Sequence, residues 1–250
     1  MGLHILVLQQ TNGEGPGRLL LSAAEQLSID LHIVHCWQTA IPDPNPFDGL
    51  IILGGSPNIE EESDYPFLRE EKSFIKAWLS LNRPCLGFRL GHQLLAHSLN
   101  ARIGPNFQPS YGFIEGHLTS EGKQHPLFRD LKGPLTLFKS HGHVIIPPLP
   151  RQITVLATSR DSLVEAFSLK NRPHIIGVQF DNHAAHPDDL KNWTYHDNHL
   201  PNSSHLKSPD NDYLVNQATL FLHTVQKEFL LLFYNFIKMI HSGDPTVTKT

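Results

Sequence analysis

The first hundred residues alternate short apolar runs with segments of helical periodicity, and this alternation constrains the fold most strongly. The predicted strands and helices lie, in chain order, at 3–8, 17–28, 31–36, 50–55, 67–81, 84–88 and 90–100. Strands that alternate with helices in this way indicate an α/β protein with a parallel, doubly wound sheet. Such sheets bind ligands beyond the carboxyl ends of their strands, which is where Gly54-Gly55 and the turn after 84–88 fall.

The pattern changes from about residue 101, where strand-like pieces follow one another without long helices between them. These pieces lie at 101–104, 111–119, 136–141, 154–158, 163–169 and 174–180. They predict a mostly antiparallel extension of the sheet. A short helix is expected over 186–196, and apolar residues three and four apart predict a long helix over 213–240. We expect a single domain over 1–240 and a disordered tail over 241–250.

Composition excludes several classes of partner. The net charge is −4, and the Lys and Arg residues form no long run, so no nucleic-acid partner is expected. The N-terminus lacks the features of a signal peptide, and the apolar run at 229–240 is too short to cross a bilayer. The two cysteines, Cys36 and Cys85, are expected to be free buried thiols in a reducing, cytoplasmic compartment.

The stretch Gly87-Phe88-Arg89-Leu90-Gly91 has the form of a nucleophile elbow. A strand precedes it, a helix follows it, and glycines flank it. Such a turn projects one side chain into a pocket and directs backbone N–H groups of the helix N-terminus at the same place. Here the projecting residue is Arg89, and a guanidinium that stays protonated cannot act as a nucleophile.

Four further stretches occur in order along the chain: FDGLIILGGSPN at 47–58, RPCLGFRLGHQLLAHSLNARIG at 83–104, FKSHGHVIIPPLP at 138–150 and GVQF at 177–180. Together with the elbow they resemble class I glutamine amidotransferases, specifically the stand-alone group similar to the glutaminase part of GMP synthase. The resemblance covers about residues 3–240. It implies a flavodoxin-like α/β fold, with the elbow site at the carboxyl edge of the sheet.

The resemblance also implies a catalytic triad of cysteine, histidine and glutamate, and this chain differs at all three positions. The family's elbow cysteine is replaced by Arg89, its histidine by Asp181 and its glutamate by His183. Loss of the nucleophile alone removes nearly all covalent catalysis in comparable triads. We therefore expect no glutaminase activity. Cys85 lies inside the strand before the elbow and is better explained as a small buried hydrophobe than as a substitute nucleophile.

The new residues have complementary charges. The resemblance places Arg89 opposite Asp181, so we hypothesise that they form an ion pair across the old catalytic pocket. The alternative is that both side chains point to solvent.

The remaining pocket residues follow from the resemblance as well. It implies that the backbone N–H groups of Gly55 and Leu90 are oxyanion-hole donors, and that Gln93, Ser140, His141 and Gly142 line the glutamine pocket. With Arg89 beside them, these groups could bind glutamine, a small carboxylate or a phosphate. The alternative is that they only maintain the fold.

Two classes of function therefore stay open. The first is a pseudoenzyme that binds a small anion or a protein partner, such as a synthetase or a second copy of the chain. The second is an active amidotransferase or hydrolase with a nucleophile foreign to the family. No cofactor is expected. Histidines 183, 186, 196, 199 and 205 cluster near Asp188 and Asp189, but histidines of polar loops are usually solvated, so no metal site is expected.

Overall fold

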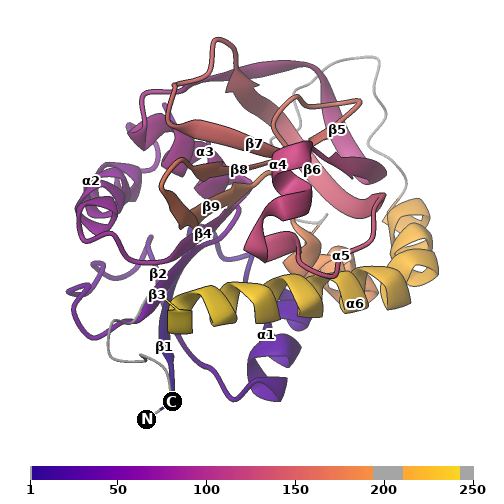
Figure 1. Cartoon of the computed structure of the whole chain (residues 1–250), viewed down its shortest axis with the longest axis horizontal. Coiled ribbons are helices and arrows are strands. Elements are labelled where there is room, and N and C mark those ends of the chain that lie inside the picture. The colour runs from indigo at the N-terminus through magenta and orange to yellow at the C-terminus, as the bar shows by residue number, and fades with distance from the viewer. Residues whose placement is uncertain (1, 194–210, 243–250) are drawn as a thin grey trace.

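The computed structural model describes residues 2–193 and 211–242, which form a nine-stranded sheet with helices on both faces (Figure 1). The strand order is β2-β1-β3-β4-β9-β8-β7-β5-β6, which makes β2 and β6 the two edge strands. Neighbours from β2 to β9 pair in parallel, and the pairs from β9 to β6 are antiparallel. The prediction of a doubly wound parallel sheet with an antiparallel extension is confirmed.

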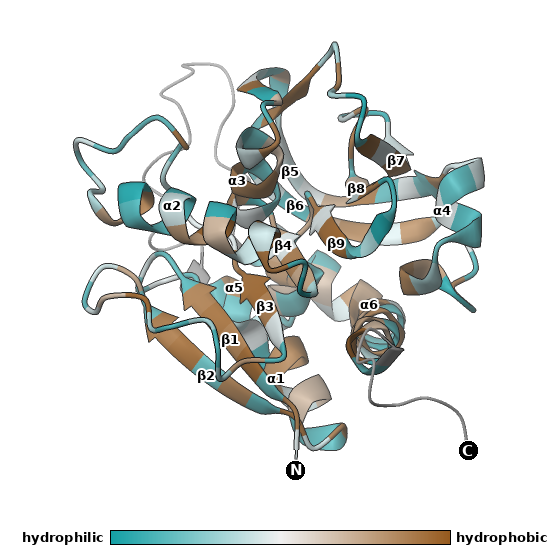
Figure 2. Ribbon diagram, turned by 60° about the vertical axis from the view of Figure 1, so that its left-hand side comes forward, coloured by the Kyte–Doolittle hydropathy of each residue, from teal (hydrophilic) through white to brown (hydrophobic). Residues whose placement is uncertain are grey.

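The parallel half follows the predicted order with small differences at element ends. Its elements are β1 (His4–Gln9), α1 (Gly17–Gln26), β2 (Asp30–His35), β3 (Gly49–Ile52), α2 (Phe67–Ser80), β4 (Cys85–Phe88) and α3 (Leu90–Ser98). Strands β3 and β4 are buried along their whole length, as strands covered on both faces must be, and β1 is buried beyond its first residue. Figure 2 shows the matching hydrophobic colour along β1 and β3.

Each face of the sheet has its own apolar core. Helix α1 buries Leu20 and Ala23 on one face, in the same cluster as Phe229 and Phe233 of α6 (Asn211–Ser242). Helix α2 buries Ile75 and Trp78 in the cluster on the other face. In Figure 1 the long helix α6 runs beside α1 and α5 (Pro187–Trp193). This two-sided cover leaves the strand ends as the open edges where a site can form.

The second half contains the antiparallel strands and several short helices. Its elements are β5 (Arg102–Leu118), α4 (Ser120–Gln124), η1 (Pro126–Phe128), β6 (Leu135–Ile146), β7 (Ile153–Ser159), β8 (Ala166–Leu169), β9 (Arg172–Val178) and η2 (Asn182–Ala184). The two separate pieces expected at 101–104 and 111–119 are one strand, β5, and that expectation was wrong. A register shift between Pro105 and Ser110 lets β5 continue past its prolines.

Three further expectations concern the helices and the cysteines. The predicted helices over 186–196 and 213–240 correspond to α5 and α6. The expected tail lies almost entirely outside the described residues. Cys36 and Cys85 are buried and form no disulfide, as predicted. No helix in the described ranges is both long and apolar enough to span a membrane.

Candidate functional site at the elbow

The turn between β4 and α3 is a tight elbow centred on Arg89. Its backbone has φ 41° and ψ −98°, a strained conformation for a residue other than glycine. The flanking glycines are required by space: a Cβ on Gly91 would lie 2.3 Å from the carbonyl oxygen of Ile52, and one on Gly87 would lie 2.6 Å from the Gly91 carbonyl carbon. The N–H of Arg89 donates to the carbonyl of Val178 at 2.9 Å, which fixes the elbow to the end of β9.

The side chain of Arg89 is directed inward and is only 5% exposed. Its Nε lies 2.9 Å from Oδ2 of Asp181, and its Nη1 donates to the carbonyl of Ser140 at 3.1 Å. Its Nη2 forms a second ion pair, with Oε1 of Glu14. The hypothesis of an ion pair between Arg89 and Asp181 is confirmed, and the alternative of two solvent-facing side chains is wrong.

Glu14 is the functional residue that sequence reasoning missed. It lies in the loop between β1 and α1, is 2% exposed, and accepts hydrogen bonds from Thr11 Oγ1 at 2.7 Å and Ser56 Oγ at 2.9 Å. Burial disfavours its charged form, but the Arg89 charge and these hydrogen bonds outweigh burial and lower the pKa of Glu14. A single glutamate in the loop TNGEGPG carries no pattern that could have identified it.

The other two residues that the resemblance assigns to the triad lie just after β9, beside the elbow. Asp181 donates its N–H to the carbonyl of Phe138 at 2.9 Å, and its Oδ1 lies 3.5 Å from Nε2 of His183. The second ring nitrogen of His183, Nδ1, lies 2.8 Å from the carbonyl of Pro16. Both side chains are fully buried. The three positions that the resemblance assigned to the triad therefore lie together, in a buried row of charged and polar groups.

Little space remains where a substrate would lie. A cavity of about 40 Å³ is lined by residues 56–58 and by Gly55, Arg89, Leu90, Gln93, His141, Gly142 and His143. That volume holds one or two water molecules. Ser140 does not line the cavity and instead contributes its carbonyl to Arg89. Within the described residues, the N–H groups of Gly55 and Leu90 make no hydrogen bond, so both expected oxyanion-hole donors stay available.

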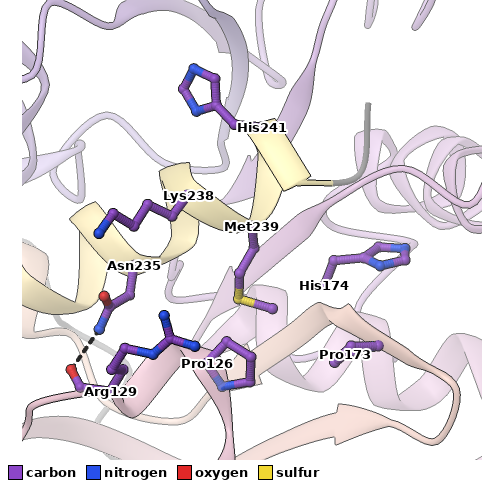
Figure 3. Close-up of a pocket in the computed structure, with 8 residues that line it drawn as sticks. All are labelled: Pro126, Arg129, Pro173, His174, Asn235, Lys238, Met239 and His241. Carbon is purple, nitrogen blue, oxygen red and sulfur yellow. Dashed lines mark hydrogen bonds between the residues drawn. The ribbon is translucent and has the colours of Figure 1, made fainter. Parts of the chain in front are cut away.

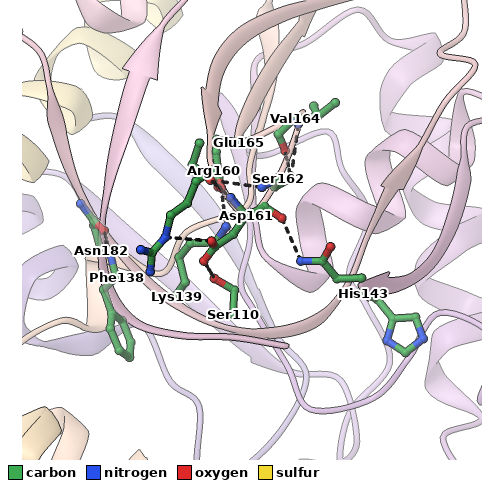
Figure 4. A network of polar contacts seen from close by, with 12 residues as sticks. Ser110, Phe138, Lys139, His143, Arg160, Asp161, Ser162, Val164, Glu165 and Asn182 are labelled. Atoms are coloured by element: carbon green, nitrogen blue, oxygen red, sulfur yellow. Dashed lines mark hydrogen bonds and ion pairs between the residues drawn. The ribbon is translucent and has the colours of Figure 1, made fainter. Parts of the chain in front are cut away.

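Two polar side chains that line this cavity, those of His141 and Gln93, have their charge state or hydrogen bonding fixed by the protein. Burial, and then the charges of Lys139 and Arg89, lower the pKa of His141 far below its usual value, so its ring is neutral. Gln93 donates its amide to the carbonyl of His143 at 3.0 Å and is committed to structure. Lys139 and Glu165 form a fully buried ion pair that joins β6 to the start of β8 (Figure 4).

No accessible thiol lies near the elbow among the described residues. Cys85 is fully buried inside β4, and burial raises the pKa of its thiol far above the usual value. Cys36 is also buried, and burial with the charges of Glu71 and Glu70 raises its thiol pKa as well. Neither cysteine can supply a thiolate nucleophile to the pocket.

The histidine cluster does not form a metal centre in the described part of the chain, where no group of three or more His, Cys, Asp or Glu side chains could hold an ion. His183 belongs to the buried row at the elbow. Nδ1 of His186 lies 3.8 Å from Oδ2 of Asp188 on α5. Asp189 accepts a hydrogen bond from the N–H of Arg18 at 2.7 Å. His196, His199 and His205 lie outside the described residues.

Comparison with known proteins identifies the family. The glutamine amidotransferase class-I model matches residues 12–191. A glutamine amidotransferase-like protein of Salmonella typhimurium is 33% identical over 163 residues, which are 64% of this chain and 66% of that protein, just under two thirds of its length. One subunit of the glutamine-hydrolysing GMP synthase of Sulfolobus acidocaldarius is 29% identical over 149 residues, 60% of this chain and 74% of the relative.

A similarity in structure agrees with the match in sequence. The crystal structure of a glutamine amidotransferase from Thermotoga maritima superposes with a TM-score of 0.82 at 21% identity, covering 95% of this chain and 99% of the other. At that identity the likeness supports the fold, and the family rests on the match over 12–191. This chain belongs to the class I glutamine amidotransferase family.

Proposed function

We propose that this chain is a class I glutamine amidotransferase domain that does not hydrolyse glutamine and acts as a binding component for a protein partner. One observation carries the proposal. The elbow position that must present a nucleophile holds Arg89, and its guanidinium is bound internally by Glu14, Asp181 and the Ser140 carbonyl. A protonated guanidinium has no lone pair to attack an amide.

The surroundings of Arg89 also oppose glutamine binding in the old pocket. The buried guanidinium of Arg89 is already paired with two carboxylates, those of Glu14 and Asp181. The remaining cavity of about 40 Å³ is water-sized. A substrate would have to enter this small space, where the lining cation, Arg89, is already paired with two buried carboxylates.

A protein partner is supported by the relatives. Several of them are named as one subunit of a glutamine-hydrolysing GMP synthase, a name that denotes a component of a larger enzyme. The partner we propose is a synthetase subunit. The alternative partner is a second copy of this chain, which would make a homodimer. The buried free thiols of Cys36 and Cys85 support a reducing, cytoplasmic setting for that complex.

A second candidate function is the binding of a small anion at the elbow. It is favoured by the N–H groups of Gly55 and Leu90, which line the cavity and are not used by described residues. Two such donors hold a carboxylate or phosphate oxygen well. The small volume of the cavity and the internal pairing of Arg89 make this candidate weaker than partner binding.

An active enzyme with a foreign nucleophile is the remaining alternative. It finds no support at the elbow, because Cys85 is fully buried and its thiol stays protonated. The decisive test is release of ammonia and glutamate from glutamine. It compares the natural protein, a triple variant that combines Arg89→Cys, Asp181→His and His183→Glu, and a matched double variant that keeps Arg89.

We expect no release from the natural protein or the double variant, and measurable turnover from the triple variant. Ammonia release by the natural protein would overturn the proposal, and its loss in Cys85→Ser would identify the nucleophile. Sedimentation velocity of the natural protein then separates the two forms of partner. A dimer indicates a second copy of this chain, and a monomer leaves the synthetase subunit.

A further inference from the structure

A second site lies at the opposite edge of the sheet from the elbow. Here a hollow of about 650 Å³ opens between the segment after η1, the start of β9 and the last turns of α6 (Figure 3). Eight residues line it: Pro126, Arg129, Pro173, His174, Asn235, Lys238, Met239 and His241. His174 lies at the start of β9, whereas Asp181 and the elbow lie beyond the strand ends, so the two sites are separate.

The hollow is basic in a chain whose net charge is −4. Its lining contains Arg129, Lys238 and two histidines, and it contains no acidic side chain. Arg129 is exposed and forms no ion pair within the described part of the chain. Lys238 is exposed, and its Nζ lies 4.3 Å from the centre of the Tyr234 ring.

A structural explanation accounts for only part of this charge. Lys238 and His241 lie in the last turns of α6, where cations stabilise a helix through its dipole. Arg129 is not on α6 but follows η1, more than a hundred residues earlier in the chain. The helix dipole therefore gives no reason for an arginine at this position.

The hollow is held open by a fixed contact. Asn235 is 4% exposed, and its Nδ2 donates to the carbonyls of Leu127 at 3.0 Å and Arg129 at 2.8 Å. These bonds join the segment after η1 to α6. Figure 3 shows Asn235 between Arg129 and Lys238, so this contact ties together the two backbone segments that carry the cationic side chains.

We infer that this hollow binds a small molecule that carries a phosphate group, with Arg129 and Lys238 at the phosphate. An arginine fork and an ammonium are the usual protein groups for phosphate. Met239, Pro126 and Pro173 supply an apolar surface for the rest of the ligand. The volume lies in the range of small-molecule pockets, about 300 to 1,000 Å³. A neighbouring hollow shares His174 and His241, but its lining contains Asp48 as well as Arg83, and the carboxylate disfavours an anion there.

The test is calorimetric titration of the whole protein with adenosine 5′-monophosphate, inorganic phosphate and adenosine. We expect binding of the nucleotide, weaker binding of phosphate and none of adenosine. Arg129→Gln and Lys238→Gln should each weaken nucleotide binding about tenfold or more. The matched control is Arg151→Gln, since Arg151 is also exposed but does not line the hollow.

Three results would overturn the inference. These are no binding at millimolar nucleotide, equal weakening by Arg151→Gln, and binding that persists in the Arg129→Gln, Lys238→Gln double variant. The elbow variant Arg89→Cys, Asp181→His, His183→Glu tests the location. Unchanged binding there supports the hollow, whereas lost binding would assign the phosphate to the elbow. The inference is independent of the proposed function, because glutamine hydrolysis is not measured in this experiment.

Discussion

Nε of Arg89 lies 2.9 Å from Oδ2 of Asp181, although the two residues are far apart in sequence. The contact follows from the sheet. Strands β4 and β9 pair in parallel with Phe88 opposite Val178, so the residues that follow each strand emerge side by side. A parallel sheet brings such side chains together at its carboxyl edge. This geometry assembles a buried ion pair at the elbow.

Removal of Glu14 should destabilise the protein strongly. Glu14→Ala leaves Arg89 buried with one carboxylate partner instead of two, and loss of a partner from a buried ion pair costs about 3 kcal/mol. The free energy of unfolding from urea titration measures this loss. Glu25→Ala removes an exposed glutamate and should change stability little. Equal stabilities of the two variants would contradict the role given to Glu14.

Gly54 should tolerate no side chain. A Cβ there would lie 2.7 Å from Oδ1 of Asp181 and 2.8 Å from Nε of Arg89. Gly54→Ala should therefore cost about 1 to 3 kcal/mol through overpacking against the ion pair. The matched control is Gly142→Ala, because a Cβ at Gly142 meets nothing within 4 Å. Thermal melting compares the two variants, and an unchanged melting temperature for Gly54→Ala would refute the close packing.

Glu71 should make stability fall as pH rises toward neutrality. It is fully buried on α2, burial raises its pKa to about 7, and its one hydrogen bond comes from Gln10 Nε2 at 2.6 Å. Between about pH 4.5 and 7 the unfolded state loses this proton while the folded state keeps it. The contribution of Glu71 to the free energy of unfolding is therefore greatest below pH 4.5 and is lost by pH 7, a change of about 3 kcal/mol.

The isosteric variant Glu71→Gln tests this pH dependence. It keeps an amide partner for Gln10 and removes the titration, so its stability should fall less between pH 5 and 7 than that of the natural protein. Glu60→Gln is the control, since Glu60 is exposed. Parallel stability curves for the natural protein and Glu71→Gln would rule out the effect.

His92 should have the opposite influence in acid. It is fully buried, its ring lies 5.0 Å from that of Phe167, and burial, with a contribution from the Lys139 charge, lowers its pKa to about 3. Below pH 6.5 the histidine binds a proton in the unfolded state but stays neutral in the folded state. Its contribution to the free energy of unfolding therefore falls by about 1.4 kcal/mol for each pH unit by which the pH is lowered. Glu71 has the opposite slope in this range, so His92→Gln should make stability fall more steeply as pH rises from 5 to 6.5 than in the natural protein, as measured by urea titration. The exposed His32→Gln should leave the slope of the natural protein unchanged.

The alternation of strands and helices was sufficient to predict the parallel half of the fold, and the family resemblance predicted the meeting of Arg89 with Asp181. Buried strands such as β3 are apolar throughout, and the elbow is marked by its flanking glycines. The continuous strand β5 could not be predicted in the same way. Pro105 and Pro109 look like breaks in a strand, and only pairing with β6 on both sides of the bulge keeps them within it.

The residues that complete each site were beyond sequence reasoning for another reason. Glu14 acts on Arg89 only because the loop after β1 folds over the end of β4, and no local pattern records that contact. The basic hollow draws Arg129, His174 and Lys238 from three distant segments. Periodicity predicts which face of an element is buried, but it does not predict which loops meet.

The edge strand β2 has a consequence for the behaviour of the protein in concentrated solution. A free strand edge can pair with the edge of another molecule and begin aggregation. In β2 the residues Asp30, His32 and His35 are exposed, and Leu31 and Ile33 are half-buried against the core. Polar and ionisable groups along this edge disfavour the approach of a second strand. At this edge of the sheet, the apolar central strands are therefore flanked by a strand that is a poor template for intermolecular sheets.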